Sequence, residues 1–124
     1  MIWLVIRSWL LLIRIAILLR SEGLAGVQRA LRKQKVRQHA TSVGSEVAVC
    51  RAVDIASVFY LKPVLCLQRS AVASIMLRRC GHGAEMVIGA QVCPLKSHAW
   101  VEIGHVVVND KPYMREIYRE MVRC

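Results

Sequence analysis

The sequence predicts a single α+β domain in which helices come first and a small antiparallel sheet follows. Up to about residue 80 apolar residues recur at helical spacing, whereas after Gly83 short β-branched runs alternate with a period near two. The 124 residues, 56% of them hydrophobic, suffice for one core without disulfide or metal staples. With only 7 Gly and 3 Pro, the composition excludes collagen-like and disordered chains.

The first 20 residues are apolar, but their charges disfavour a membrane span. Arg7 and Arg14 limit the uncharged runs to six residues, and a charge at the bilayer centre costs roughly 3 kcal/mol. A signal peptide is disfavoured because no basic region precedes the stretch and no small-residue cleavage site follows it. We predict an amphipathic helix with Arg7, Ser8 and Arg14 on one face, docked on the domain, on a partner or on a membrane surface. The rest of this helix surface is assigned to Trp3, Leu4, Leu10, Leu11 and Ile17.

The segment Ser21-Glu22-Gly23 interrupts this helix, and a second helical pattern with a basic face follows. Residues 1–40 carry eight basic and one acidic side chain, so most of the formal charge of +10 lies there. Residues 41–45 are typical of a loop. We therefore divide the chain into an N-terminal helical arm, 1–44, and a compact domain, 45–124. The arm suits a membrane or an acidic polypeptide better than nucleic acid, because residues 20–40 contain no ring to stack on bases.

The compact domain is expected to contain two helices, three strands and a closing helix. Ser45 is the predicted N-cap of a helix that runs to about Tyr60. The next helix starts at Cys66 and ends at Gly81 or Gly83. The core positions assigned to the first of these helices are Val49, Val53, Ala56 and Phe59. The predicted strands are AEMVIGAQV, HAWVEI and VVVND, and the closing helix runs from Tyr113 to Val122.

A hairpin between the last two strands brings a histidine and a carboxylate together. A three-residue loop, Ile103-Gly104-His105, sets His98 opposite Asp110 and places Trp100 and Val108 on the same face. A two-residue loop sets His98 beside Asn109 or Lys111 instead. We therefore keep Asn109 as the alternative partner of His98.

Cys66, His98 and Asp110 form a candidate catalytic triad if the Cys66 helix packs on the His98 face. Cys66 lies in the first turn of its helix, where the helix dipole stabilises a thiolate nucleophile. His98 is then general base and later general acid, and Asp110 fixes the imidazole tautomer. The backbone N–H groups of Cys66 and Leu67 would form an oxyanion hole. The alternative is a buried, inert cysteine beside an ordinary strand histidine.

The remaining cysteine and glycine patterns predict neither a metal nor a cofactor. Five cysteines without a C-x-x-C pair are typical of reduced thiols and indicate a cytoplasmic location. A zinc site remains an alternative, although its spacing fits no familiar structural site. Its ligands would be Cys80, His82, Cys93 and His98. No nucleotide-binding glycine pattern is present.

The blocks CLQRS, GAEMVIG, SHAWVEI and VVVND together resemble a known family. From about Ser45 to Tyr118 the sequence is similar to the transglutaminase-like leader peptidases of lasso-peptide biosynthesis. Cys66 in C-L-x-R-S, His98 in H-A-W-V-E and Asp110 in V-N-D follow the family order. The resemblance implies a papain-like cysteine peptidase core, with these three residues as the triad, that cuts the leader from a ribosomal precursor peptide.

The resemblance also implies partners and supporting residues. Longer members carry a leader-recognition domain before the protease region, so we expect a separate leader-recognition protein here, with the apolar N-terminal helix as a candidate docking surface. A separate asparagine-synthetase-like cyclase would close the macrolactam. Arg69 and Ser70 match the family motif and lie on the helical face of Cys66. Trp100 either walls the substrate cleft or packs in the core.

Two other function classes remain open at this stage. The charge and the N-terminal helices would suit a basic protein that binds membranes or nucleic acid without catalysis. A thioester formed on Cys66 would also permit acyl transfer to an amine in place of hydrolysis.

Overall fold

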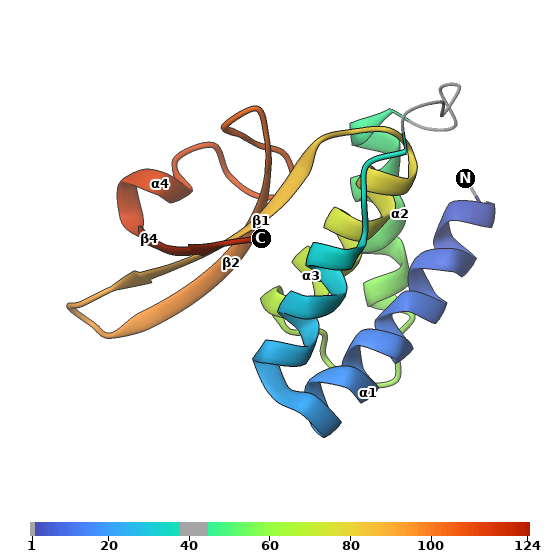
Figure 1. The fold of residues 1–124 in the computed structure, drawn as a ribbon, viewed down its shortest axis with the longest axis horizontal. Helices are drawn as coiled ribbons and strands as arrows, with labels where there is room; N and C mark the ends of the chain where they lie inside the picture. Colours follow the sequence, from blue (N-terminus) through green and yellow to red (C-terminus); the bar gives the residue numbers. More distant parts are fainter. Residues whose placement is uncertain (1, 38–44) are drawn as a thin grey trace.

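The computed structural model describes residues 2–37 and 45–124, which form a helical layer against an antiparallel sheet (Figure 1). The helices are α1 (Ile2–Lys33), α2 (Glu46–Val58), α3 (Cys66–Arg79) and the one-turn α4 (Met114–Ile117). The strands are β1 (Ala84–Gln91), β2 (Lys96–Ile103), β3 (Val106–Val107) and β4 (Arg119–Arg123). The predicted α+β class is confirmed.

Local sequence signals set the ends of α2 and α3. The Ser45 side chain accepts a hydrogen bond from the Ala48 N–H at 3.2 Å, as expected of an N-cap. Helix α3 begins at Cys66, and its C-terminal end is followed by Gly81 at a φ of 90°, a value that favours glycine. The predicted position of Cys66 in the first turn is therefore confirmed. Phe59, which was assigned to the core, is exposed because α2 ends one residue before it.

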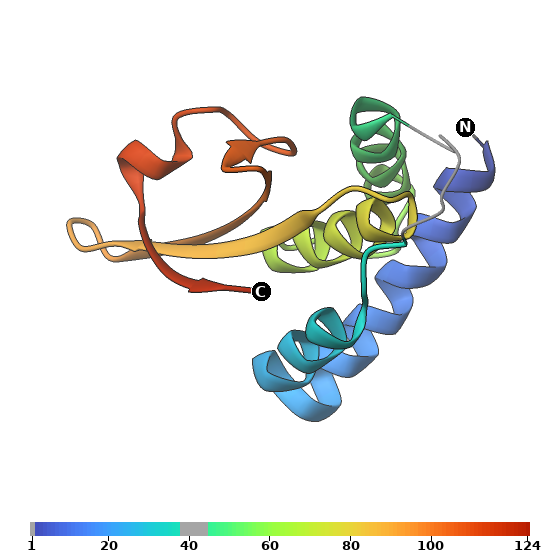
Figure 2. The ribbon, with the colours of Figure 1, turned by 45° about the horizontal axis from the view of Figure 1, so that its top comes forward.

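Helix α1 bends sharply at Gly23, where φ is 69°, so the predicted interruption is confirmed (Figure 2). Both segments of α1 pack on α2 and α3. The predicted polar face is wrong at Ser8, which is fully buried among Leu11, Leu12 and Ile15. By length and composition α1 would be able to cross a membrane, a property it shares with core helices and signal sequences.

The described part of residues 1–44 shares one hydrophobic cluster with the rest of the chain. Val27 and Leu31 of α1 are buried in the same cluster as Val72 of α3 and Val101 of β2. The division of the chain at residue 44 stays a prediction, and the loop expected around residues 41–44 lies outside the described residues.

The sheet has the order β3-β2-β1-β4, with antiparallel neighbours throughout. One face, with Met86 and Val101, belongs to the cluster that the helices form. The opposite face, with Val87 and Trp100, is covered by Met114 of α4. Helix α3 lies against the face that carries Met86 and Val101 (Figure 1).

The predicted closing helix is wrong over most of its length, because only Met114–Ile117 is helical and Arg119–Arg123 is strand β4. Strand β1 is central in the sheet, so its second edge needs a hydrogen-bonding partner. Cys124 supplies part of it by exchanging backbone hydrogen bonds with Met86 at 2.9 and 3.0 Å. Arg123 adds an ion pair with the buried carboxylate of Glu102 at 3.0 Å. These long-range contacts override the local helical pattern.

The buried guanidinium of Arg78 joins the helical layer to the start of β1 and to Cys124 after β4. It donates to the carbonyl oxygens of Ala84 and Cys124, each at 2.7 Å. It also donates to the carbonyls of Leu31 and Gln34 at the end of α1. The guanidinium has five donors in a rigid fork, so one side chain satisfies carbonyls from three separate elements.

We expect Arg78→Leu to lower the free energy of unfolding by about 3 kcal/mol, because buried carbonyl acceptors would lose their donor. Arg78→Lys should recover only part of this loss, since an ammonium does not reproduce the planar fork. Urea unfolding followed by circular dichroism measures both. The matched control is Arg79→Leu, because within residues 2–37 and 45–124 the Arg79 side chain donates only to the Gln34 side chain, at 3.3 Å. Equal effects at the two positions would contradict the role of Arg78.

Candidate functional site

His98 and Asp110 form the central contact of the site, with His98 Nε2 2.5 Å from Asp110 Oδ2. The predicted contact is therefore present, but the predicted hairpin is wrong. The loop has two residues, Gly104 and His105, both with positive φ, and it pairs Ile103 with Val106. This is the geometry that two-residue hairpin turns favour.

Asp110 reaches His98 because the chain leaves the strand ladder after Val107. The Asn109 side chain accepts the Val101 N–H at 2.7 Å, while its own amide donates to Ser70 Oγ at 3.1 Å. Ser70 in turn donates to the Ala99 carbonyl at 3.0 Å. Asn109 thus fastens the segment between α3 and β2, and Asp110 is the residue next to the ring. Val108 packs in the helical core rather than on the Trp100 face, which corrects its predicted position.

Arg69 connects this segment to the two helices. One of its nitrogens lies 3.5 Å from Asp54 Oδ1 of α2, and another lies 3.9 Å from Asp110 Oδ2. The latter nitrogen also donates to the Asn109 carbonyl at 3.5 Å. Arg69 and Ser70, predicted to lie beside Cys66, therefore both contact the 109–110 segment, one through charge and one through a hydrogen bond.

The electrostatic environment separates the two carboxylates. Burial acts to raise the pKa of Asp110, but the hydrogen bonds with His98 and the Lys111 N–H, together with the charge of Arg69, outweigh it. The pKa of Asp110 is thus lowered. For Asp54, burial raises the pKa more than Arg69 lowers it. Asp110 is therefore the carboxylate held in its ionised form beside the imidazole.

Two aromatic rings hold the imidazole from the sheet side. His98 stacks on Tyr118 with ring centroids 5.4 Å apart, and on Trp100 with centroids 6.2 Å apart. Trp100 is fully buried, and its indole N–H donates to Glu102 at 2.8 Å. Of its two predicted roles, lining the cleft or packing in the core, the structure shows core packing.

Cys66 and His98 line the same cavity, of about 140 Å³, with Ile88, Ser97 and Ala99. The triad was predicted on the condition that α3 packs on the sheet face that His98 shares with Trp100. This condition is not met, because α3 lies against the opposite face, which carries Val101. Among the described residues no hydrogen bond joins the Cys66 thiol to the His98 ring. The structure thus brings the thiol and the imidazole to one cavity, with no hydrogen bond between them among the described residues.

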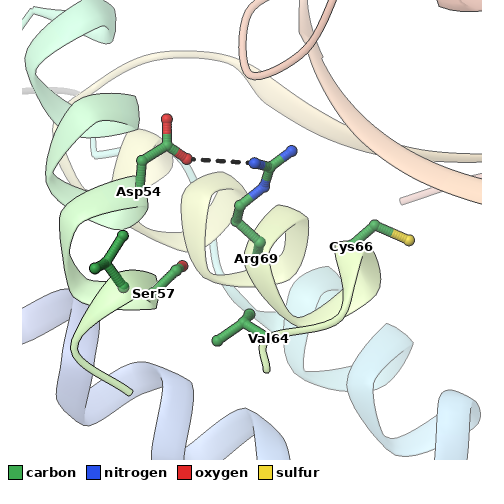
Figure 3. A pocket seen from close by; sticks show the side chains of 6 residues that line it. Asp54, Ser57, Val64, Cys66 and Arg69 are labelled. Atoms are coloured by element: carbon green, nitrogen blue, oxygen red, sulfur yellow. Dashed lines mark ion pairs between the residues drawn. The ribbon is translucent and has the colours of Figure 1, made fainter. Parts of the chain in front are cut away.

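A larger pocket of about 440 Å³ lies on the other side of Cys66. Figure 3 shows Asp54 and Arg69 pointing toward one another across it, whereas the Cys66 thiol points away from them. Ser57, Val58 and Val64 complete the lining. Cys66 therefore borders two cavities, one with the imidazole and one with a carboxylate.

The other cysteines differ from Cys66 in their surroundings. Burial raises the pKa of the Cys50 thiol to about 11, with Asp54 and Glu46 adding to the effect. All five cysteines are free thiols. Within residues 2–37 and 45–124 no three His, Cys, Asp or Glu side chains gather as metal ligands, so the alternative zinc set is not assembled there.

The sequence profile of the transglutaminase-like superfamily matches residues 9–123. The chain belongs to this superfamily. The chain is also similar to the microcin J25-processing protein McjB of Escherichia coli, with 41% identity over 51 residues. That match covers 41% of this chain and 24% of the relative, so the chain spans about a quarter of its length. No solved structure matches the chain.

Three residues of this transglutaminase-like site were not foreseen from the sequence. Tyr118 was assigned to a helix, and the strand that follows it, REMVR, shows no apolar–polar alternation that would have marked it. Gly89 pairs with His98 in the sheet, and an added Cβ there would lie 2.6 Å from Trp100 Cη2 and 2.8 Å from Tyr118 Cβ. Glycine inside a strand indicates such a close approach. No sequence signal marked Asp54, which reaches the site from α2.

The ionised form of Asp110 should make stability depend on pH. Since its pKa is lowered in the folded chain, its contribution is present above the ordinary carboxyl pKa of about 3.9 and is lost as the pH falls through the lower folded value. We expect the difference in unfolding free energy between the wild type and Asp110→Asn to shrink on acidification. Urea unfolding from neutral to acidic pH measures it. Asp54→Asn should show the opposite trend, because the folded pKa of Asp54 is raised.

Gly89→Ala should destabilise the chain by about 1–3 kcal/mol, because the added methyl overlaps the Trp100 ring and the Tyr118 Cβ. Thermal unfolding measures the loss. As a control, Gly83→Ala adds a methyl that has no atom within 4 Å and should change stability far less. Equal losses at the two positions would show that the ring contacts are not the cause.

Proposed function

We propose that this chain is a cysteine peptidase that removes the leader peptide from a ribosomally made lasso-peptide precursor. Cys66 is the nucleophile, His98 the general base and then acid, and Asp110 the carboxylate that orients His98. The proposal rests on two observations about His98. Its ring lies 2.5 Å from Asp110, and it lines the same cavity as Cys66. The superfamily and the relative, a processing protein for microcin J25, support the same reaction class.

In the first half of the reaction His98 accepts the Cys66 proton while the sulfur attacks the scissile carbonyl carbon. Because Nε2 is engaged by Asp110, the nitrogen that serves Cys66 is Nδ1. The Cys66 and Leu67 N–H groups, in the first turn of α3, have no acceptor within the helix and are the candidate oxyanion donors. The C–N bond then breaks, the imidazolium gives its proton to the leaving amine, and a thioester to Cys66 remains.

In the second half water attacks the thioester. His98 accepts a proton from the water, the C–S bond breaks, and the sulfur leaves as a thiolate. An acid is released at the end of the leader. If an amine replaced the water, the product would be an amide, which is the acyl-transfer alternative. The ionised Asp110 favours the imidazolium in both halves.

The partners expected from the resemblance belong to this proposal as well. The substrate is the lasso precursor, a separate protein presents its leader, and an asparagine-synthetase-like cyclase acts after cleavage. The reaction takes place in the cytoplasm and uses no cofactor.

The decisive experiment is cleavage of a precursor peptide followed by mass spectrometry, with and without the candidate leader-recognition protein. Wild type should cut at the leader junction, and Cys66→Ala should not. Asp110→Ala should lower kcat/KM by about 100- to 10,000-fold, because the imidazole loses its orienting group. Product mass separates hydrolysis from acyl transfer.

The matched control is Cys93→Ala, since Cys93 is an exposed thiol in the β1–β2 turn. It should cut at the wild-type rate. Cleavage that persists in Cys66→Ala, or that is absent in the wild type under every condition, would refute the peptidase and favour a binding protein.

A further inference from the structure

Helix α1 carries a second apolar stripe on the side turned away from the core. Its buried side uses Leu4, Leu11, Leu12 and Ile15. The second stripe consists of Trp3, Ile6, Leu10, Ile13 and Ile17. Four of these five are exposed, Trp3 and Ile17 each at 63%, and Ile13 is partly buried. A surface helix needs one apolar face, so the second face lacks a partner in the described structure.

The spacing of this outer stripe is that of a helix-pairing seam. Its members are separated by three, four, three and four residues. This interval keeps the side chains in a narrow line along one helix, as the a and d positions of paired helices do. Ile2, 77% exposed, and the partly buried Trp9 and Ala16 lie beside the stripe and widen the apolar surface of α1 on one flank. The three-four spacing itself is that of a helix partner.

The stripe continues into a groove of about 530 Å³ beside the α2–α3 loop. Ile13 and Ile17 form one wall, and Leu61 and Leu65 form the other. Leu61 is 87% exposed and Leu65 59% exposed, so the apolar surface extends beyond α1 itself. A helix laid along α1 would therefore contact two walls rather than one ridge.

The borders of the stripe and groove are basic. Arg7 and Arg14 flank the stripe at equivalent positions seven residues apart, and Arg20 and Lys62 line the groove. Within residues 2–37 and 45–124, none of these four side chains makes an ion pair with a carboxylate. Nearby Arg79 has its pKa lowered first by burial and then by the charges of Arg7 and Arg14, so the cations lie close enough to repel one another. A second copy of this chain would bring the same charges to the seam.

We propose that this outer stripe binds an amphipathic helix of another polypeptide, with apolar residues at three-four spacing and acidic residues on both flanks. The apolar residues cover Leu10, Ile13 and Ile17, and the acidic flanks pair with the arginines. This binding is independent of the peptidase reaction, because the stripe lies on α1 and contains none of the residues of the Cys66–His98 cavity.

The test uses two synthetic peptides of three heptads, identical at the apolar positions, with Glu or Lys at the flanking positions. Calorimetric titration into the full chain should give about tenfold tighter binding for the Glu peptide. The double variant Leu10→Glu with Ile17→Glu should lose this binding. Leu95→Glu is the matched control, because Leu95 is equally apolar, 83% exposed, and lies in the β1–β2 turn far from α1 (Figure 1).

Charge reversal supplies the decisive arm. The double variant Arg7→Glu with Arg14→Glu should bind the Lys peptide more tightly than the Glu peptide, the reverse of the wild type. A misfolded variant would lose binding to both peptides and would not reverse the order. Equal binding of the peptides, no binding, or no loss in the stripe variant would overturn the proposal. Two further outcomes would overturn it: the wild type self-associates, or it binds phosphatidylglycerol vesicles, and in either case the Leu10→Glu with Ile17→Glu variant no longer does so. The titration contains no precursor, so its outcome does not depend on peptidase activity. A chain that fails in the precursor-cleavage experiment but prefers the Glu peptide here would refute the peptidase and leave this proposal standing.

Discussion

The guanidinium of Arg78 is the contact on which the arrangement of the two layers depends. It lies at the end of α3, where the chain turns from helix to sheet, and it binds carbonyls of α1, of the start of β1 and of the C-terminal residue. Backbone acceptors buried without donors are costly, so the end of α1, the start of β1 and the end of β4 are all fixed relative to α3. Because α3 also carries Cys66 at its other end, the same contacts fix the position of Cys66 relative to the sheet.

The site itself is built at the edge of β2 where the regular ladder stops. A longer β3 would pair its backbone with β2 and, in the observed register, would bring Lys111 opposite His98. Instead the Asn109 side chain takes the Val101 N–H, and Ser70 of α3 links it to the strand. Because these side chains replace ladder hydrogen bonds, few backbone groups of residues 108–110 and β2 lose a partner. The same irregular segment places the Asp110 carboxylate beside the His98 ring. Arg69 balances the negative charge that results.

The sequence predicted the chemistry of this region better than its geometry. The cap at Ser45 and the position of Cys66 were predicted from local signals. The contact between His98 and Asp110 was predicted from a three-residue loop, whereas the loop has two residues and the contact forms because the chain leaves the ladder after Val107. The hairpin register was wrong by one residue because both loop lengths are compatible with a single Gly104. Strand β4 was missed because its pairing partner, β1, lies some thirty residues earlier in the chain. Local pattern carries no information on such contacts.

Strand β4 also shows why that error matters for the site. Its end is held by Arg78 through the Cys124 carbonyl, and its Arg123 pairs with the buried Glu102. Glu102 in turn accepts from the Trp100 indole. Tyr118, at the start of this strand, stacks on His98, and Gly89 leaves the space that both rings occupy. The orientation of the imidazole thus depends on Asp110 from one side and on the C-terminal strand from the other. A helix at residues 113–122, as the local pattern predicted, would have left the ring with the carboxylate and Trp100, and the side of His98 that packs against Tyr118 would have been open to water.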